Sequence, residues 1–283
     1  MMNYYHVDVF AEKALAGNGL TVIFPEKPIS TQTMQDIAAE FKQYESAFIF
    51  PPEQGVYPVR IFTVQEELEF AGHPLIGSAA LLHELNHADE EQALISLFVA
   101  GRTLKLESRR EKSFYSVQMN QGRTQTICVS IDVGLEELAS WFSLKRQQID
   151  ESLPLSVMSN GLSYLYVPVR KALDKIHICV PDLEKRIEKF GARFVYFFDP
   201  ETLECRTWDN TGIYEDVATG SAAGPLLGYL VQNGCREKNT NITLSQGRFL
   251  NRPSKISGSV NDAGEVRISG SVALFAKGVV CLD

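Results

Sequence analysis

The sequence has few cysteines, no long hydrophobic run and no excess of positive charge, and each shortage excludes a class of protein. The chain of 283 residues has five cysteines, an odd number with no Cys-x-x-Cys pair. Neither a disulfide framework nor a zinc ribbon is therefore predicted, and a reducing compartment is expected. The longest apolar runs, such as residues 94–100, fall far short of the roughly 20 residues that cross a bilayer. The five cysteines are Cys128, Cys179, Cys205, Cys235 and Cys281.

The charge balance is acidic. Lys and Arg number 27 against 35 for Asp and Glu, which gives a formal net charge of −8. Without a basic run, partners such as nucleic acid or an anionic membrane are not expected. The N-terminus has no charged segment followed by an apolar one, so a signal peptide is not predicted and a cytoplasmic location is expected. With 45% hydrophobic residues the chain can fold, and its length favours about two domains.

Two helices rich in small residues organise the chain. Residues 71–82 and 218–230 are too long and too rich in Ala, Gly and Leu for strands, and each has a glycine, Gly72 or Gly220, near its start. These glycines lie 148 positions apart, about half the chain. Alternating polarity elsewhere, as in 5–9 and 20–24, predicts strands.

This spacing predicts an α+β fold of two topologically related halves. Each half would be a mostly antiparallel, barrel-like sheet around one buried helix, because a helix that is apolar on nearly all faces has to be covered all round. The expected boundaries are 1–118 and 119–267, with the last strand, 268–283, returning to the first half. The alternative is an ordinary α+β protein in which two Gly-Ala helices coincide.

The starts of the two helices are candidate anion sites. A helix N-terminus presents backbone N–H groups without acceptors and a partial positive charge. His73 and Ser221 lie at these starts, and the acidic pair Glu215-Asp216 precedes the second one. Glu45 borders an apolar run, where desolvation could raise its pKa. For each residue a structural explanation stays open: capping for the helix starts and a surface position for Glu45.

A second motif competes with this site. His83-Glu84-Leu85-Asn86-His87 fits H-E-x-x-H, in which two histidines on one helix face bind zinc and the glutamate acts as a base. The motif falls at the end of the first small-residue helix, where the helix dipole favours histidines anyway, and no third His or Cys follows nearby. We therefore favour a surface helix over a zinc hydrolase and predict no metal site.

Several motifs together resemble the PhzF, or phenazine-biosynthesis-like, family. The resemblance is carried by Gly17-Asn18, Glu45-Ser46-Ala47-Phe48, Arg60-Ile61-Phe62-Thr63, Glu69-Phe70-Ala71-Gly72-His73-Pro74 and Gly212 to Ala222. It implies the diaminopimelate-epimerase-like fold, with two pseudo-symmetric domains and an active-site cleft between them. It also implies a homodimer and a cofactor-independent isomerase that acts on a small carboxylated substrate.

The resemblance also assigns roles to residues. Glu45 matches the general acid/base, and His73 and Asp216 match polar groups that bind and orient the substrate. Gly72, Gly220 and Ser221 match the donors at the helix ends, and Asn18 matches a substrate-binding position. Related racemases of this fold use a cysteine at each helix start, but none of the five cysteines lies in either motif, so a two-thiol mechanism is not expected. A non-catalytic ligand-binding protein on the same fold stays the alternative.

Overall fold

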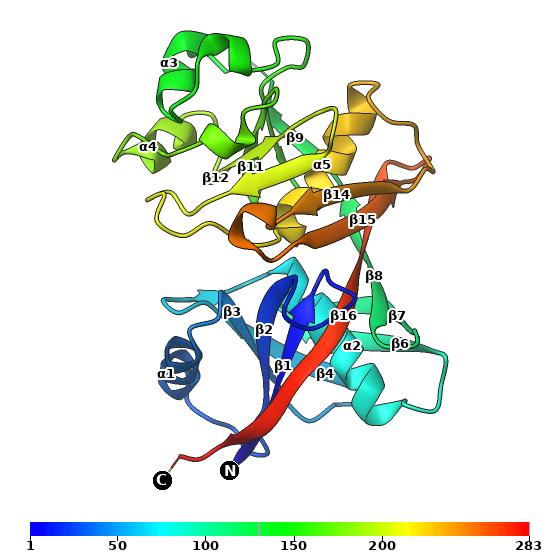
Figure 1. Cartoon of the computed structure of the whole chain (residues 1–283). Helices are drawn as coiled ribbons and strands as arrows, with labels where there is room; N and C mark the ends of the chain where they lie inside the picture. The colour runs from blue at the N-terminus through cyan, green and yellow to red at the C-terminus, as the bar shows by residue number, and fades with distance from the viewer. Residues whose placement is uncertain (130, 283) are drawn as a thin grey trace. The chain divides into compact units, whose positions relative to one another are not determined.

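A computed structural model describes residues 1–129 and 131–282 (Figure 1). It confirms the α+β class: one continuous path of strands accompanies a small number of helices. Contacts divide the chain into two units. Unit 1 comprises Met1–Asn120 and the C-terminal segment that begins at Ser269, and unit 2 comprises Gln121–Ile268.

Unit 1 is a closed barrel of eight strands. They follow the order β1-β2-β3-β4-β6-β7-β8-β16, and β16 pairs with β1 to close the ring. Most neighbours are antiparallel, whereas β2–β3 and β4–β6 are parallel. The strands are β1 (Met2–Val9), β2 (Asn18–Phe24), β3 (Glu45–Ile49), β4 (Val56–Phe62), β6 (Gln92–Val99), β7 (Arg102–Arg110), β8 (Tyr115–Arg123) and β16 (Glu265–Val280), and the two-residue strand β5 (Glu67–Leu68) pairs with β4 outside the ring.

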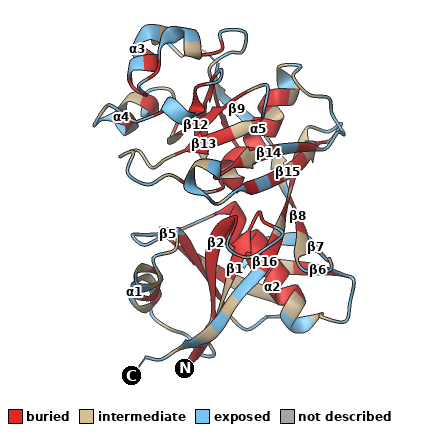
Figure 2. Cartoon of the chain, in the orientation of Figure 1, coloured by how far each residue is buried: buried red, intermediate tan, exposed pale blue. Residues whose placement is uncertain are grey.

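The helix α2 (Gly72–Asn86) is the core of this barrel. Its first twelve residues are all buried, and it packs against β1, β2, β3, β6 and β7 (Figure 2). Gly77 shows how closely helix and sheet approach: a Cβ there would lie 2.6 Å from Leu20 and 2.9 Å from Val9. Small residues on α2 therefore set its position inside the barrel, as the composition predicts. The other helix of unit 1, α1 (Thr31–Phe41), is capped by Ser30, packs against β3 and β4, and lies outside the ring (Figure 1).

Unit 2 has the second small-residue helix, α5 (Gly220–Gln232), packed against β10, β11 and β15. Its strand order is β16-β15-β14-β13-β12-β11-β10-β9, with β11–β12 and β13–β14 parallel. The remaining elements are β9 (Gln125–Cys128), α3 (Leu135–Ser140), β10 (Ser156–Ser159), β11 (Ser163–Pro168), α4 (Leu183–Glu188), β12 (Phe194–Phe198), β13 (Glu204–Thr207), β14 (Ile242–Gln246) and β15 (Ser254–Val260), with 3₁₀ turns at Arg146–Gln148, Leu173–Lys175 and Arg248–Leu250.

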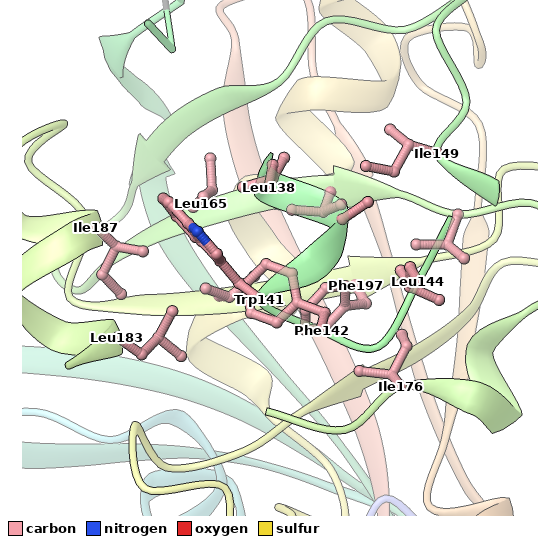
Figure 3. Packing of buried hydrophobic residues seen from close by; sticks show 14 of the residues in the cluster. Leu138, Trp141, Phe142, Leu144, Ile149, Leu165, Ile176, Leu183, Ile187 and Phe197 are labelled. Atoms are coloured by element: carbon pink, nitrogen blue, oxygen red, sulfur yellow. The ribbon is translucent and has the colours of Figure 1, made fainter. Parts of the chain in front are cut away.

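A separate apolar cluster lies on the other side of the unit 2 sheet (Figure 3). Trp141 and Phe142 at the end of α3 pack against Phe197 of β12, and the Phe142 and Phe197 rings are 4.8 Å apart in an edge-to-face arrangement. Leu183 and Ile187 of the charged helix α4 join the same cluster. The unit 2 sheet is therefore covered on both faces, by α5 on one and by this cluster on the other.

In the described residues no helix is both long and apolar enough to cross a membrane. The strands β5, β9 and β10 have only two to four residues, which is too short for alternating polarity to reveal them in the sequence.

Candidate functional site

A buried carboxylate and a buried imidazole meet in unit 1. Glu45 is the first residue of β3 and pairs in parallel register with Leu20, so it faces the same side of the sheet as Leu20, toward α2. His73 is the second residue of α2. Its Nε2 lies 3.2 Å from Oε2 of Glu45, and the two side chains are 5% and 9% exposed. The barrel therefore holds an acid/base pair at the N-terminal end of its central helix.

Burial decides the charge of the imidazole. Complete desolvation lowers the pKa of His73 to about 3, so the ring is neutral at pH 7. Nε2 of His73 and Oε2 of Glu45 approach each other to 3.2 Å without hydrogen-bond geometry, so the two groups are close neighbours that can each carry a proton. Such a pair can take up or release a proton, as general acid/base chemistry requires.

The backbone next to this pair adds hydrogen-bond donors. The N-cap residue Ala71 makes no side-chain cap, and Pro74 has no N–H, so Gly72 and His73 supply the first backbone donors of α2. The first N–H groups of a helix have no acceptor within the helix, and the helix dipole favours an anion there.

Asn18 lies on the same inner face as Glu45. It is the first residue of β2, two positions before Leu20, and is buried. The preceding Gly17 has φ +68°, and a Cβ at Gly17 would lie 2.3 Å from the carbonyl oxygen of Val9. Only glycine fits this turn, which therefore fixes where Asn18 enters the barrel.

The start of α5 in unit 2 is organised around Asp216. Its Oδ2 accepts a hydrogen bond from the Thr219 hydroxyl, and its Oδ1 accepts one from the backbone N–H of Ala218 at 3.4 Å. Gln246, the last residue of β14, donates from Nε2 to the Asp216 carbonyl oxygen at 2.9 Å and to Thr219 Oγ1 at 3.0 Å. All three side chains are buried. The carboxylate is thus held in a network instead of extending freely.

The two other residues predicted at this helix start lie beside Asp216 in the chain. Ser221 Oγ is 2.8 Å from the hydroxyl of Tyr164, and the carbonyl oxygen of Gly220 accepts a hydrogen bond from Gln121. The N–H groups of Ala222 and Ala223 bond to the Thr219 carbonyl, so Gly220 and Ser221 present the first backbone donors of α5.

Glu215, the neighbour of Asp216, has a structural role. It forms a bidentate pair with Arg206, at 2.6 and 2.7 Å, and both side chains are less than 10% exposed. The guanidinium also lies over the rings of Trp208 and Phe249. This buried pair anchors the segment that leads into α5, so only Asp216 of the acidic pair is a candidate for ligand contact.

The structure therefore groups the predicted residues by unit. Asn18, Glu45, Gly72 and His73 lie in unit 1, and Asp216, Gly220 and Ser221 lie in unit 2. Sequence reasoning missed Thr219, Gln246 and Tyr164. The only sequence signal for Gln246 is the glycine after it: Gly247 has φ +82°, and a Cβ there would lie 2.7 Å from the carbonyl oxygen of Val217.

The interpretation of His83 as part of a surface helix is wrong. His83 is fully buried; its Nδ1 lies 2.8 Å from Ser108 Oγ and its Nε2 lies 3.1 Å from the Glu90 carbonyl oxygen. Glu84 accepts a hydrogen bond from Tyr115. Both ring nitrogens of His83 thus make internal contacts that tie α2 to β7 and to the following loop. Within residues 1–129 and 131–282, no group of three or more His, Cys, Asp or Glu side chains is arranged to hold a metal ion.

A buried carboxylate beside a neutral imidazole, at a helix N-terminus inside a barrel, is an arrangement typical of acid/base enzymes. The comparisons then specify the family. The model of the family described as phenazine biosynthesis-like protein matches residues 7–278, so the chain belongs to the PhzF family, and it is an isomerase.

Relatives and solved structures agree with this assignment. The chain is 31% identical, over all of both chains, to the trans-2,3-dihydro-3-hydroxyanthranilate isomerase of Pseudomonas chlororaphis. A solved structure described as a predicted epimerase of Pseudomonas aeruginosa superposes with a TM-score of 0.94 at 41% identity, covering all of both chains. A probable proline racemase of Agrobacterium radiobacter shares the fold alone, with a TM-score of 0.68 and 13% identity over 100% of this chain and 94% of that one.

Proposed function

We propose that this protein isomerises a small carboxylated metabolite by moving a proton from one carbon to another, with Glu45 as the general acid/base and without a cofactor. The observation that carries the proposal is the buried contact of 3.2 Å between Glu45 and the neutral His73 at the start of α2. The relative from Pseudomonas chlororaphis, named trans-2,3-dihydro-3-hydroxyanthranilate isomerase, supplies the first substrate to test.

The proposed reaction balances without an oxidant or a reductant. The Glu45 carboxylate takes a proton from a substrate carbon, the electrons of that C–H bond shift through the neighbouring unsaturated system, and the carboxylic acid returns the proton to a second carbon. Negative charge that develops on the substrate is stabilised by the N–H groups at the helix starts. The proposal places Asn18, Gly72 and His73 of unit 1 and Asp216, Gly220 and Ser221 of unit 2 around one substrate.

The test is hydrogen exchange in D₂O. The chain is incubated with trans-2,3-dihydro-3-hydroxyanthranilate and then with a panel of small cyclic carboxylic acids, and deuterium at carbon is followed by NMR. Glu45→Gln keeps the size of the side chain but cannot accept the proton, so we expect exchange to fall by about 10²- to 10⁴-fold while ligand affinity is retained. Glu40→Gln, an exposed change on α1, is the matched control and should leave exchange unchanged.

The outcomes separate two functions. Exchange that disappears with Glu45→Gln supports the isomerase. Binding of ligands without exchange of any of them would favour the non-catalytic ligand-binding protein. Full activity of Glu45→Gln on a substrate that the wild type turns over would show that another group moves the proton.

A further inference from the structure

The amide of Gln246 can be oriented in only one way. Its Oε1 lies 3.1 Å from the backbone N–H of Thr219, which can only donate, and its Nε2 lies 2.9 Å from the carbonyl oxygen of Asp216, which can only accept. Exchanging the oxygen and the nitrogen would oppose like groups at both contacts. The oxygen also accepts the hydroxyl of Tyr196 at 2.9 Å, so all four hydrogen-bonding positions of the amide are used.

This orientation sets the direction of the next bond. The second hydrogen of Nε2 points to Thr219 Oγ1, so the Thr219 hydroxyl accepts from Gln246 and turns its own proton elsewhere. That proton goes to Oδ2 of Asp216. If Asp216 Oδ2 were protonated, its hydrogen and that of the Thr219 hydroxyl would both lie between Oδ2 and Thr219 Oγ1. The Thr219 hydroxyl cannot turn away, because the N–H of Gln246 already occupies its acceptor side.

We infer that Gln246 is a positioning residue for Asp216: its amide fixes the direction of the hydrogen bonds to the carboxylate, so that Asp216 meets a ligand as a proton acceptor. The inference rests on the proposed function only in treating Asp216 as a ligand-binding group. It predicts that the Asp216 carboxylate selects ligand groups that donate hydrogen bonds, such as an ammonium or a hydroxyl.

The backbone next to Gln246 allows the end of β14 to lie close to the segment that contains Asp216. A Cβ at Gly247, where φ is +82°, would lie 2.3 Å from the Arg252 carbonyl oxygen and 2.7 Å from that of Val217. Only glycine lets the end of β14 approach the segment before α5 so closely. Gln246 itself is 1% exposed, so water does not compete for its four hydrogen bonds.

The other titratable groups near Asp216 do not determine the direction of its hydrogen bonds. Burial raises the pKa of Tyr196 on β12 well above its usual value, and it likewise raises that of Cys205 on β13, so both stay neutral across the physiological range. Arg206 on β13 and Glu215 compensate each other in a bidentate pair. Tyr196 and Cys205 are neutral, and Arg206 is paired with Glu215, so a change at Gln246 should act on Asp216 directly.

The experiment follows the Asp216 carboxyl carbon by NMR in the full chain labelled with ¹³C-aspartate, without ligand, and Asp216→Asn identifies its signal. Gln246→Glu removes both donors and adds a negative charge, so the midpoint of the Asp216 titration should rise by about one pH unit or more. Gln246→Met frees the Thr219 hydroxyl to accept, and a smaller rise is expected. Tyr229→Phe, which loses only a bond to the Pro154 carbonyl oxygen, is the matched control and should not move the midpoint.

An unchanged midpoint in folded Gln246→Glu and Gln246→Met would overturn the inference. If neither variant folds, Thr219→Val decides: it removes the donor to Oδ2 and should raise the midpoint, whereas Thr219→Ser should restore it. No shift in Thr219→Val would show that the hydroxyl does not donate to Asp216. Because the readout needs no substrate, a shift without isomerase activity would support the role of Gln246 and count only against the proposed function.

Discussion

The charge of His73 is the property of the site that pH should reveal most directly. An unfolded histidine has a pKa of about 6.5, whereas burial lowers that of His73 to about 3. As the pH falls through 6.5, His73 binds a proton in the unfolded chain but stays neutral in the folded chain, so the free energy of unfolding should fall with decreasing pH. At pH 5 this difference destabilises the folded state by about 2 kcal/mol relative to pH 8.

The assay has two parts. NMR of the imidazole Cε1–H signals should show His73, identified by its loss in His73→Asn, unprotonated down to about pH 5. Urea unfolding at pH 8 and pH 5 should show a loss of stability that is about 2 kcal/mol smaller in His73→Asn than in the wild type. A His73 signal that titrates above pH 6 would refute the reasoning, because attraction to Glu45 would then outweigh desolvation and the pair would be ionic.

Two further predictions concern the frame of the site and the H-E-x-x-H motif. Glu215→Gln leaves the Arg206 charge buried without its partner and should cost about 3–5 kcal/mol of stability, measured by urea unfolding. Glu151→Gln, in the exposed pair with Arg146, is the control and should have little effect. Equal effects of the two changes on stability would mean that burial of the pair does not matter. Metal analysis of the purified protein should find no stoichiometric zinc, and stoichiometric zinc that disappears in His87→Ala would contradict this.

Helices that depend on neighbouring residues in the sequence were predictable. The helix α1 follows from the Ser30 cap and from apolar residues at spacings of three and four, and α2 and α5 follow from glycine before a run of small residues. The α+β class then follows, because such helices need a sheet around them. Glu45 and His73 were candidates from their local positions, but their catalytic and binding roles came only from the family resemblance, since a lone Glu before a strand and a His at a helix start each have ordinary explanations.

Features set by distant partners were not predictable. The burial of His83 depends on Ser108, 25 residues away on β7, and nothing near His83 in the sequence indicates that contact. The role of Gln246 depends on Tyr196 and Thr219, which lie 50 and 27 residues from it. A glutamine in an alternating strand is typical of a solvent-exposed position, so only the packed structure shows that this amide is buried with every hydrogen bond made.

The two helix starts differ in how their protons are held, and this difference argues for a division of roles. Glu45 and His73 approach each other to 3.2 Å, and each is a group that can bind or release a proton. Around Asp216 each proton has one place, because a backbone N–H and a backbone carbonyl orient Gln246, and Gln246 orients Thr219. A group that transfers protons has to exist in two protonation states during turnover, whereas a group that binds a ligand works best in one. The pair in unit 1 is therefore suited to proton transfer and the network in unit 2 to binding. The pH dependence of turnover should accordingly follow Glu45, and Gln246→Glu should add a second dependence that the wild type lacks.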